Sequence, residues 1–481
     1  MKRAIILLFL TIFTLGNSAF AQEFKAADWL EDFAQLKREM SANYANLEWA
    51  IKERGLNLKQ ISEQTEASLQ KARDQAEAQA AIDVFLRQFA DSHLRAEWIS
   101  KGGNQSAENN SQPVSRSLCR QMGYQPSPYV KPGVAFSDFE NYRRLGGESS
   151  KYLPAGVLTL STGKKIGVIR IALFMESQFS DLCAQAVAER GLTDNSNCND
   201  ECLMHVNLRV SNLLTEHLAA QVKNLKREKI DALVIDISSN GGGTNWYEPA
   251  ARTLSAKTLQ AGTSGFIRHP HWTKQLKERL STLEAEIAKT SSLKFKKLLT
   301  QSVKNLRADI AKTEKTCERR AVWENRKLEC SLVEIASKPV LPYAKPNKSE
   351  DDSAIKLLNG ASYYTYEQGV YAGELLVLID QRTASSSEAF TAMLKDNGAA
   401  QVIGQPSMGA GCGYTNGGIE TVLKNSGARI RMPDCVRFRA DGTNEVAGIT
   451  PDILIPWRQN DTPFQKAKRT IETIEKIFAA K

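Results

Sequence analysis

Short apolar runs alternate with long helical stretches from residue 156 onward, and this alternation constrains the fold more than any other feature of the sequence. Two of the runs, 230–237 and 375–379, are mostly apolar. Residues 205–229, directly before the first run, carry apolar side chains at helical spacing. Strands that are apolar on both faces are typical of a sheet covered by helices on each side. The pattern therefore predicts an α/β (α+β) core that is interrupted by insertions.

Helical periodicity dominates two other parts of the chain. Residues 27–91 carry apolar side chains at helical spacing, which predicts a small N-terminal helical bundle. Two heptad-like apolar stripes between residues 272 and 320 predict a pair of long antiparallel helices inserted into the core. The segment 272–329 holds fifteen Lys or Arg against eight Asp or Glu, in a chain of net charge +9. A solvated helical face explains this basic hairpin most simply, and contact with an anionic envelope surface or a partner protein is the functional alternative.

The first 21 residues have the composition of a cleavable signal peptide. Lys2 and Arg3 are followed by an apolar run, residues 4–15, and then by Ala-Phe-Ala at 19–21. The apolar run is short for a membrane span, and no cysteine follows the expected cleavage site. We therefore expect a periplasmic or secreted protein without a lipid anchor and without a nucleic-acid partner.

All eight cysteines lie beyond residue 21, and an even number of cysteines in an exported chain indicates disulfides. Proximity along the chain favours pairing Cys317 with Cys330, and Cys412 with Cys435 across an expected hairpin. The pairing of the other four cysteines stays open.

A zinc site built from Cys198, Cys202 and His205 is the alternative for one cysteine pair. It is the weaker hypothesis, because an oxidising compartment disfavours free thiolates and the usual second pair of ligands is missing. We therefore expect no metal and no cofactor.

The segment 383–388, Thr-Ala-Ser-Ser-Ser-Glu, joins an apolar run to a helix-like stretch at 389–394. A serine at such a strand-to-helix turn can expose its hydroxyl oxygen, while the helix N-terminus offers backbone N–H groups to an oxyanion. This placement favours a nucleophile. The structural alternative is that the serines cap the helix and that Glu388 completes a capping box.

Three consecutive glycines, residues 241–243, follow the apolar run at 230–237. Glycine lets the backbone adopt unusual conformations and approach a ligand closely, so N–H groups here could face a reacting oxygen. Glycines after a strand also form ordinary turns. The run gains weight because it precedes the serine turn within the same predicted core.

Four motifs, taken in order, resemble the C-terminal processing peptidase and tricorn-core family of serine peptidases. They are Asn-Gly-Gly-Gly at 240–243, Thr-Ala-Ser-x-Ser-Glu at 383–388, Leu-Lys-Asp-Asn-Gly at 394–398 and Gly-Ile-Thr-Pro-Asp at 448–452. The resemblance covers about residues 156–456 outside the helical insertion. It implies a peptidase core of ClpP/crotonase-like type that acts on peptide or protein substrates.

The resemblance also implies positions for the nucleophile and the oxyanion donors. The nucleophile would be Ser385, and the donors would be the backbone N–H groups of Ser386 and of Gly242 or Gly243. Many relatives carry a PDZ module before the core, but residues 101–153 lack its strand pattern, so we expect none here.

Two branches of this family differ in the base. The processing-peptidase branch places a lysine between two glycines, whereas the matching stretch here, 409–411, reads Gly-Ala-Gly. The tricorn-like branch uses a histidine in an Asp-Gly-His-like motif and an acidic residue before the final Gly-x-x-Pro-Asp. Residues 91–93, Asp-Ser-His, and Glu445 fill those positions. The resemblance thus implies a site of Ser385, His93 and Glu445, in which the glutamate orients the imidazolium directly or through a second polar group.

Glu388 and Ser92 lie beside the implied residues and are candidates for supporting roles. Two departures from the family pattern concern how the substrate is held. Ser238 and Ser239 stand where an arginine often precedes the glycine run, and Cys412 stands in a loop where the family usually has no cysteine.

These predictions divide the chain into consecutive parts. We expect a signal peptide (1–21), a helical bundle (22–100), a linker or mixed region (101–155), a first core part (156–270), the basic hairpin (271–335) and a second core part (336–481).

The expected function is that of an exported, metal-independent serine peptidase that acts through an acyl-enzyme. One alternative is a catalytically inactive peptide-binding or scaffold protein of the same fold, motivated by the missing lysine at Ala410. Another is an esterase-like acyl hydrolase that uses the same atoms.

Overall fold

The computed structural model describes most of the chain. The described residues are 24–98, 117–125, 133–315, 352–415 and 418–479, together with 317, 319–324, 326, 330–331, 333–337 and 340–341. The expected signal peptide and the polar stretch 101–116 lie outside these residues.

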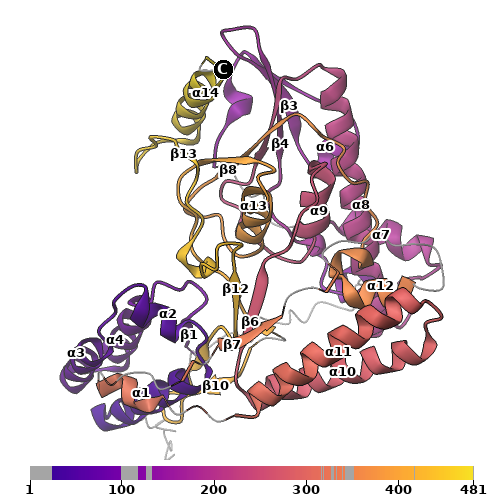
Figure 1. Cartoon of the computed structure of the whole chain (residues 1–481). Coiled ribbons are helices and arrows are strands. Elements are labelled where there is room, and N and C mark those ends of the chain that lie inside the picture. The colour runs from indigo at the N-terminus through magenta and orange to yellow at the C-terminus, as the bar shows by residue number, and fades with distance from the viewer. Residues whose placement is uncertain are drawn as a thin grey trace, which may run out of the picture.

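A seven-stranded sheet in the order β13-β9-β8-β5-β4-β3-β2 forms the centre of the upper body in Figure 1. The strands from β13 to β4 run parallel, and β3 and β2 continue the sheet antiparallel. They are β2 (Tyr142–Arg144), β3 (Ala155–Thr159), β4 (Lys165–Arg170), β5 (Ala232–Asp236), β8 (Glu374–Ile379), β9 (Gln401–Gly404) and β13 (Ile453–Leu454).

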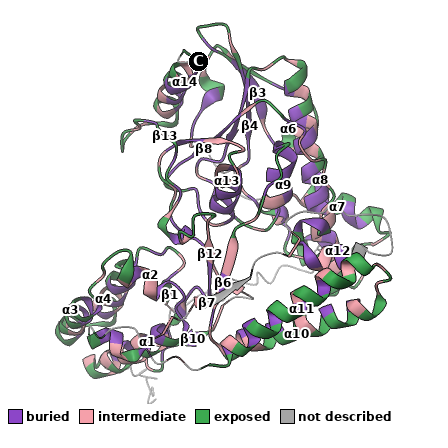
Figure 2. Ribbon diagram, viewed as in Figure 1, coloured by how far each residue is buried: buried purple, intermediate pink, exposed green. Residues whose placement is uncertain are grey.

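Helices cover both faces of this sheet. In β5, Leu233 and Ile235 join an apolar cluster with helices α7 (Ser180–Glu189), α8 (Asp200–Arg227), α9 (Tyr247–Leu254) and α13 (Ser386–Asp396). Ala232 and Val234 join a second cluster with α14 (Pro463–Ala479). Burial on both sides explains why the central strands are almost wholly apolar, and it confirms the predicted α/β core (Figure 2).

The predicted N-terminal bundle consists of α1 (Ala26–Asn43), α2 (Leu47–Lys52), α3 (Leu58–Lys71) and α4 (Gln75–Arg87). The bundle is joined to the C-terminal half of the chain. Strand β1 (Arg95–Glu97) pairs with β11 (Arg429–Arg431), which pairs in turn with β10 (Thr421–Val422). Ile430 and Met432 enter the apolar core of the bundle. The segment between α4 and β1, which contains His93, therefore lies against the C-terminal half.

A third sheet, in the order β12-β6-β7, is antiparallel and lies between the bundle and the main core in Figure 1. Its strands are β6 (Thr263–Ile267), β7 (Val333–Ser337) and β12 (Cys435–Phe438). Strand β12 leads toward the serine turn, and its residues take part in the candidate site described below.

The predicted helical hairpin follows β6. Helices α10 (Pro270–Lys289) and α11 (Leu293–Thr313) pack through their apolar stripes and against α12 (Asp352–Leu358). Their outer faces are largely exposed (Figure 2). The shorter elements are α5 (Leu118–Gln121), α6 (Ser149–Tyr152), η1 (Phe136–Asp138), η2 (Glu176–Gln178), η3 (Arg320–Glu324), η4 (Gly360–Tyr363) and η6 (Glu445–Ala447).

The eight cysteines form four disulfides, namely Cys119–Cys183, Cys198–Cys202, Cys317–Cys330 and Cys412–Cys435. Both pairs expected from proximity are confirmed. The zinc alternative is wrong, because a disulfide takes up the two thiols that it needed. Among the described residues, no helix is both long and apolar enough to cross a bilayer.

Candidate active site

Ser385 lies at the N-terminus of α13, directly after the turn that leaves β8. Its backbone has φ 55° and ψ −117°, in the positive-φ region that non-glycine residues rarely adopt. The turn is fixed to the glycine loop, because the Thr383 hydroxyl donates to the Ile237 carbonyl at 3.1 Å and the Ala384 N–H donates to the Asn240 carbonyl at 3.0 Å. Strain of this kind persists only where the surroundings enforce it, and it is common at active sites.

The glycine loop packs against this turn. Gly242 has φ 96°, and a Cβ there would lie 2.6 Å from the Ala384 carbonyl oxygen and 2.8 Å from the Ser385 Cβ. Any larger residue would push the turn away. The Gly242 N–H is committed to the Asn240 side chain at 2.9 Å. Gly242 therefore shapes the loop and has no N–H free for a ligand.

Two backbone N–H groups beside Ser385 have no hydrogen-bond partner among the described residues, those of Gly243 and Ser386. The two residues are tied together, because the Ser386 hydroxyl donates to the Gly243 carbonyl at 3.0 Å. Ser386 is also the first residue of α13, where the helix dipole favours negative charge. The pair is suited to hold an oxyanion formed next to Ser385.

Glu388 links the serine turn to the loop that follows β9. Its carboxylate is wholly buried and accepts the Ser385 N–H at 2.8 Å, as a capping box requires. It also accepts the Gly409 N–H at 2.7 Å, the Ala410 N–H at 2.9 Å and the Ser407 hydroxyl at 2.5 Å. Four donors satisfy this buried carboxylate. The Glu388 part of the predicted capping box is therefore present, and Ser385 itself is half-buried.

His93 reaches the same loop from the N-terminal bundle. Its Nδ1 lies 2.7 Å from the Ala410 carbonyl oxygen, which can only accept, so Nδ1 carries the proton and Nε2 is the basic nitrogen. Burial lowers the pKa of His93, and the bond to Ala410 opposes this shift. A neutral imidazole near pH 7 is the state that a general base needs. No hydrogen bond joins Nε2 to the Ser385 hydroxyl within the described structure, as is common in sites without substrate.

Asp91 fixes the backbone of His93. Its buried carboxylate accepts the His93 N–H at 3.0 Å, the Tyr44 hydroxyl at 3.0 Å and the Asn46 side-chain amide at 2.8 Å. Burial raises the pKa of Asp91 to about 6. Ser92, by contrast, is exposed and forms no hydrogen bond in the described structure.

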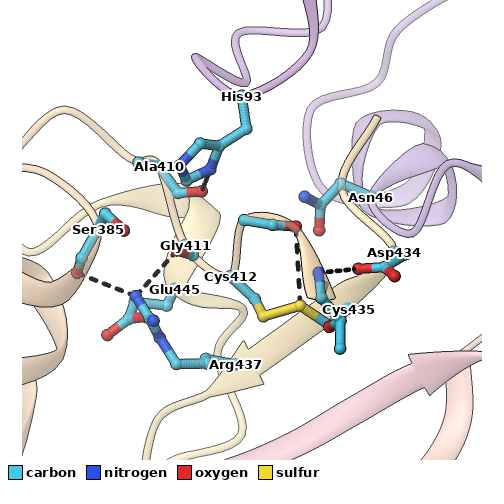
Figure 3. Close-up of a disulfide and its surroundings, with 12 residues drawn as sticks. Asn46, His93, Ser385, Ala410, Gly411, Cys412, Asp434, Cys435, Arg437 and Glu445 are labelled. Atoms are coloured by element: carbon cyan, nitrogen blue, oxygen red, sulfur yellow. Dashed lines mark hydrogen bonds and ion pairs between the residues drawn. A yellow bond between two sulfur atoms is a disulfide. The ribbon is translucent and has the colours of Figure 1, made fainter. Parts of the chain in front are cut away.

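Glu445 is the first residue of η6, and its neighbour Val446 lies against Gly409 and Gly411 of the loop that contacts the imidazole. Glu445 is buried and forms an ion pair with the guanidinium of Arg437. Arg437 in turn donates to the Ser385 carbonyl at 2.9 Å and to the Gly411 carbonyl at 2.8 Å (Figure 3). No hydrogen bond connects Glu445 with His93 in the described residues. The structure thus brings Glu445 to the nucleophile through Arg437, while the acceptor at His93 Nδ1 is a backbone carbonyl.

The model of peptidase family S41 matches residues 165–455 of the chain. The chain belongs to peptidase family S41. It is therefore a serine-type peptidase by family.

Solved structures agree on the fold of this S41 peptidase. Mature CPAF complexed with lactacystin is 14% identical, with a TM-score of 0.59 over 94% of this chain and 98% of that chain. Mature CPAF alone is 14% identical, with a TM-score of 0.56 over 94% of this chain and 97% of that chain. At this identity the likeness shows the fold. A protein of Chlamydia muridarum (strain MoPn / Nigg), described as uncharacterized, is 24% identical over 267 residues; these are 54% of this chain and only 40% of that protein's length.

Sequence reasoning missed three residues of this S41 site, namely Arg437, Asp91 as an anchor, and Tyr414, whose hydroxyl donates to the His93 carbonyl. The sequence offers one clue to Arg437, because it is a charged residue inside a strand that begins at the buried Cys435. It offers none to Tyr414, whose partner lies 321 residues away in the chain.

Proposed function

We propose that this chain is an exported peptidase that cleaves peptide bonds through an acyl-enzyme, with Ser385 as the nucleophile and His93 as the general base. The observation that carries the proposal is the strained turn of Ser385 next to two N–H groups, those of Gly243 and Ser386, that have no partner in the part of the chain that the structure describes. The Glu388 network supports it by joining this turn to the loop that His93 contacts.

The chemistry follows the order of other serine peptidases. Nε2 of His93 removes the proton of the Ser385 hydroxyl as Oγ attacks the substrate carbonyl carbon. The N–H groups of Gly243 and Ser386 stabilise the negative oxygen of the tetrahedral intermediate. His93 then gives the proton to the leaving amine, and water, activated in the same way, hydrolyses the acyl-enzyme.

Glu445 has an indirect part in this proposal. Its ion pair with Arg437 fixes a guanidinium that holds the carbonyls of Ser385 and Gly411. Both carbonyls belong to backbone segments that carry reacting or orienting groups. Glu445 is therefore a positioning residue, and the Ala410 carbonyl takes the place of an acid at His93 Nδ1.

Export rests on the signal-peptide composition of residues 1–21 and on the four disulfides, which form and persist in oxidising compartments. The substrate class is a peptide or protein segment, as for the family. Because mature CPAF has been solved in complex with lactacystin, we also propose that compound as a second probe of this site.

The test is labelling of the purified mature protein with a fluorophosphonate, with the adduct located by mass spectrometry. Ser387 supplies a matched control, because its buried hydroxyl has no hydrogen-bond partner among the described residues and lies two residues from the nucleophile. We expect an adduct on Ser385 in the wild type and in Ser387→Ala, and none in Ser385→Ala. Folded wild-type protein without any adduct would favour the inactive scaffold of the same fold.

A further inference from the structure

The loop 410–415 surrounds His93 on several sides. The Ala410 carbonyl binds Nδ1, and a Cβ at Gly413 would lie 3.2 Å from Nε2, so Gly413 faces the nitrogen that must accept the serine proton. The ring of Tyr414 meets the imidazole edge-on with centroids 5.3 Å apart, and its hydroxyl donates to the His93 carbonyl. A shift of this loop would change the surroundings of both imidazole nitrogens at once.

A disulfide fixes this loop to strand β12. Cys412 is bonded to Cys435, the first residue of β12, and the two are 23 residues apart in the chain. Two residues further along β12, Arg437 holds the Gly411 carbonyl and the Ser385 carbonyl (Figure 3). The covalent bond therefore joins the loop that orients the base to the strand that holds the nucleophile turn.

The other three disulfides lie elsewhere. Cys198–Cys202 spans four residues at the start of α8, Cys119–Cys183 joins α5 to α7, and Cys317–Cys330 follows α11. None of these cysteines is hydrogen-bonded to a residue of the candidate site in the part of the chain that the structure describes. Of the four disulfides, Cys412–Cys435 is the one that lies in the loop that contacts the imidazole.

We propose that the Cys412–Cys435 disulfide positions His93 for catalysis, so that the peptidase is fully active only when this pair is oxidised. The inference rests on the proposed roles of Ser385 and His93. Thiols stay reduced in the cytosol and are oxidised after export. The chain would then gain its full activity in the compartment where its substrates are met, and a reducing environment would withdraw that activity.

The switching reaction is thiol–disulfide exchange with a dithiol. Cys412 is half-buried and Cys435 is buried, so the attacking thiolate reaches the sulfur of Cys412 and Cys435 leaves as a thiolate. The second thiol of the reductant then attacks the mixed disulfide and releases Cys412. Two electrons pass from the dithiol to the protein, the dithiol becomes a cyclic disulfide, and its two protons end on the two cysteines.

The experiment compares oxidised and dithiothreitol-treated protein by the rate at which a fluorophosphonate labels Ser385. Alkylation and mass spectrometry identify which cysteines are free in each sample. We expect reduction of Cys412–Cys435 to lower the inactivation rate constant at saturating probe by a factor on the order of 10², with little change in the probe concentration for half-maximal rate. Re-oxidation should restore the rate. A general loss of fold would instead change both parameters and the circular dichroism spectrum.

Two double variants sharpen the result. Cys412→Ser with Cys435→Ser should label slowly with or without dithiothreitol, whereas Cys198→Ser with Cys202→Ser should behave as the wild type and keep its sensitivity to the reductant. Equal labelling of the oxidised and reduced wild type, with Cys412 and Cys435 shown to be free thiols, would overturn the inference even if the first double variant does not fold. Absence of any Ser385 adduct in the oxidised wild type would overturn the proposed function itself.

Discussion

Most of the bonds that fix the Ser385 turn come from its own sheet and turn, with Arg437 of β12 added, whereas the imidazole and the carbonyl of His93 bind residues more than three hundred positions away in the chain. The serine turn is bonded to the loop after the neighbouring strand β5 and to Glu388 three residues away. The imidazole bonds to Ala410, at a sequence separation of 317, and its backbone bonds to Asp91 and Tyr414. The nucleophile side of the site, which is Ser385 and its turn, is thus built into the core. The base side, which is His93 with Asp91 and the loop 410–415, depends on contacts between separate parts of the molecule.

The largest effect is expected at the nucleophile side. Ser385→Ala removes the attacking oxygen and keeps the Cβ, so turnover should fall by a factor on the order of 10⁴ or more while the fold is retained. Peptide hydrolysis and the thermal unfolding midpoint, measured on the same samples, check both parts. Substantial turnover by this variant would remove Ser385 from the mechanism.

Arg437 touches both sides, because it binds the Ser385 carbonyl and the Gly411 carbonyl. A lysine offers a single charged point and cannot reproduce the planar set of donors, so Arg437→Lys should lower kcat/KM by roughly 10- to 100-fold. The control is Arg439→Lys on the same segment, whose partner is Asp396. Similar losses in both variants would mean that Arg437 has only a general structural role.

Asp91 gives the base side its own pH dependence. Its pKa is raised to about 6 by burial, above its ordinary value of 3.8, so the folded state binds a proton that the unfolded state releases. The stabilisation from this proton is complete below about pH 4 and is lost as pH rises through 6, and it amounts to at most about 3 kcal/mol.

Asp91→Asn should remove this contribution. In urea unfolding, the free energy of unfolding of the wild type should rise relative to that of the variant as the pH falls from 7 to 4. A difference that stays constant over this range would contradict the raised pKa.

The smallest effect is expected at Ser92, which follows the Asp91 anchor but is exposed and unbonded in the described structure. Ser92→Ala should change stability by less than about 0.5 kcal/mol and leave the labelling rate of Ser385 unchanged. A marked loss of labelling would show that the base side contains a contact formed only with substrate.

Local patterns in the sequence predicted what is local in the structure. The apolar runs of β5 and β8, the stripes of the helical hairpin and the Ser-x-x-Glu cap each depend on neighbours within a few residues, and all three are present. The pairing of β1 with β11 has no such signal, because neither short strand is apolar enough to demand a partner.

The candidate site divides in the same way. The strand-to-helix turn indicated a nucleophile within 383–388, whereas the choice of Ser385 within it, and of His93 and Glu445, rested on the family resemblance. The contact of His93 with a backbone carbonyl could not be foreseen, since a carbonyl is present at every residue. The sequence likewise could not show that Glu445 pairs with Arg437, because several arginines lie within reach in the chain.

The most direct test of the account follows the labelling rate of Ser385 with pH, together with the NMR titration of the His93 imidazole assigned through His93→Gln. Burial lowers the pKa of His93, so the neutral base should persist below pH 6.5 and be lost only as pH falls through the shifted value. The account predicts that the rate and the imidazole titrate with one midpoint below 6.5, in the wild type and in Asp91→Asn. A rate that does not change while the imidazole titrates, or a midpoint different from that of the imidazole, would contradict the role of His93 as the base.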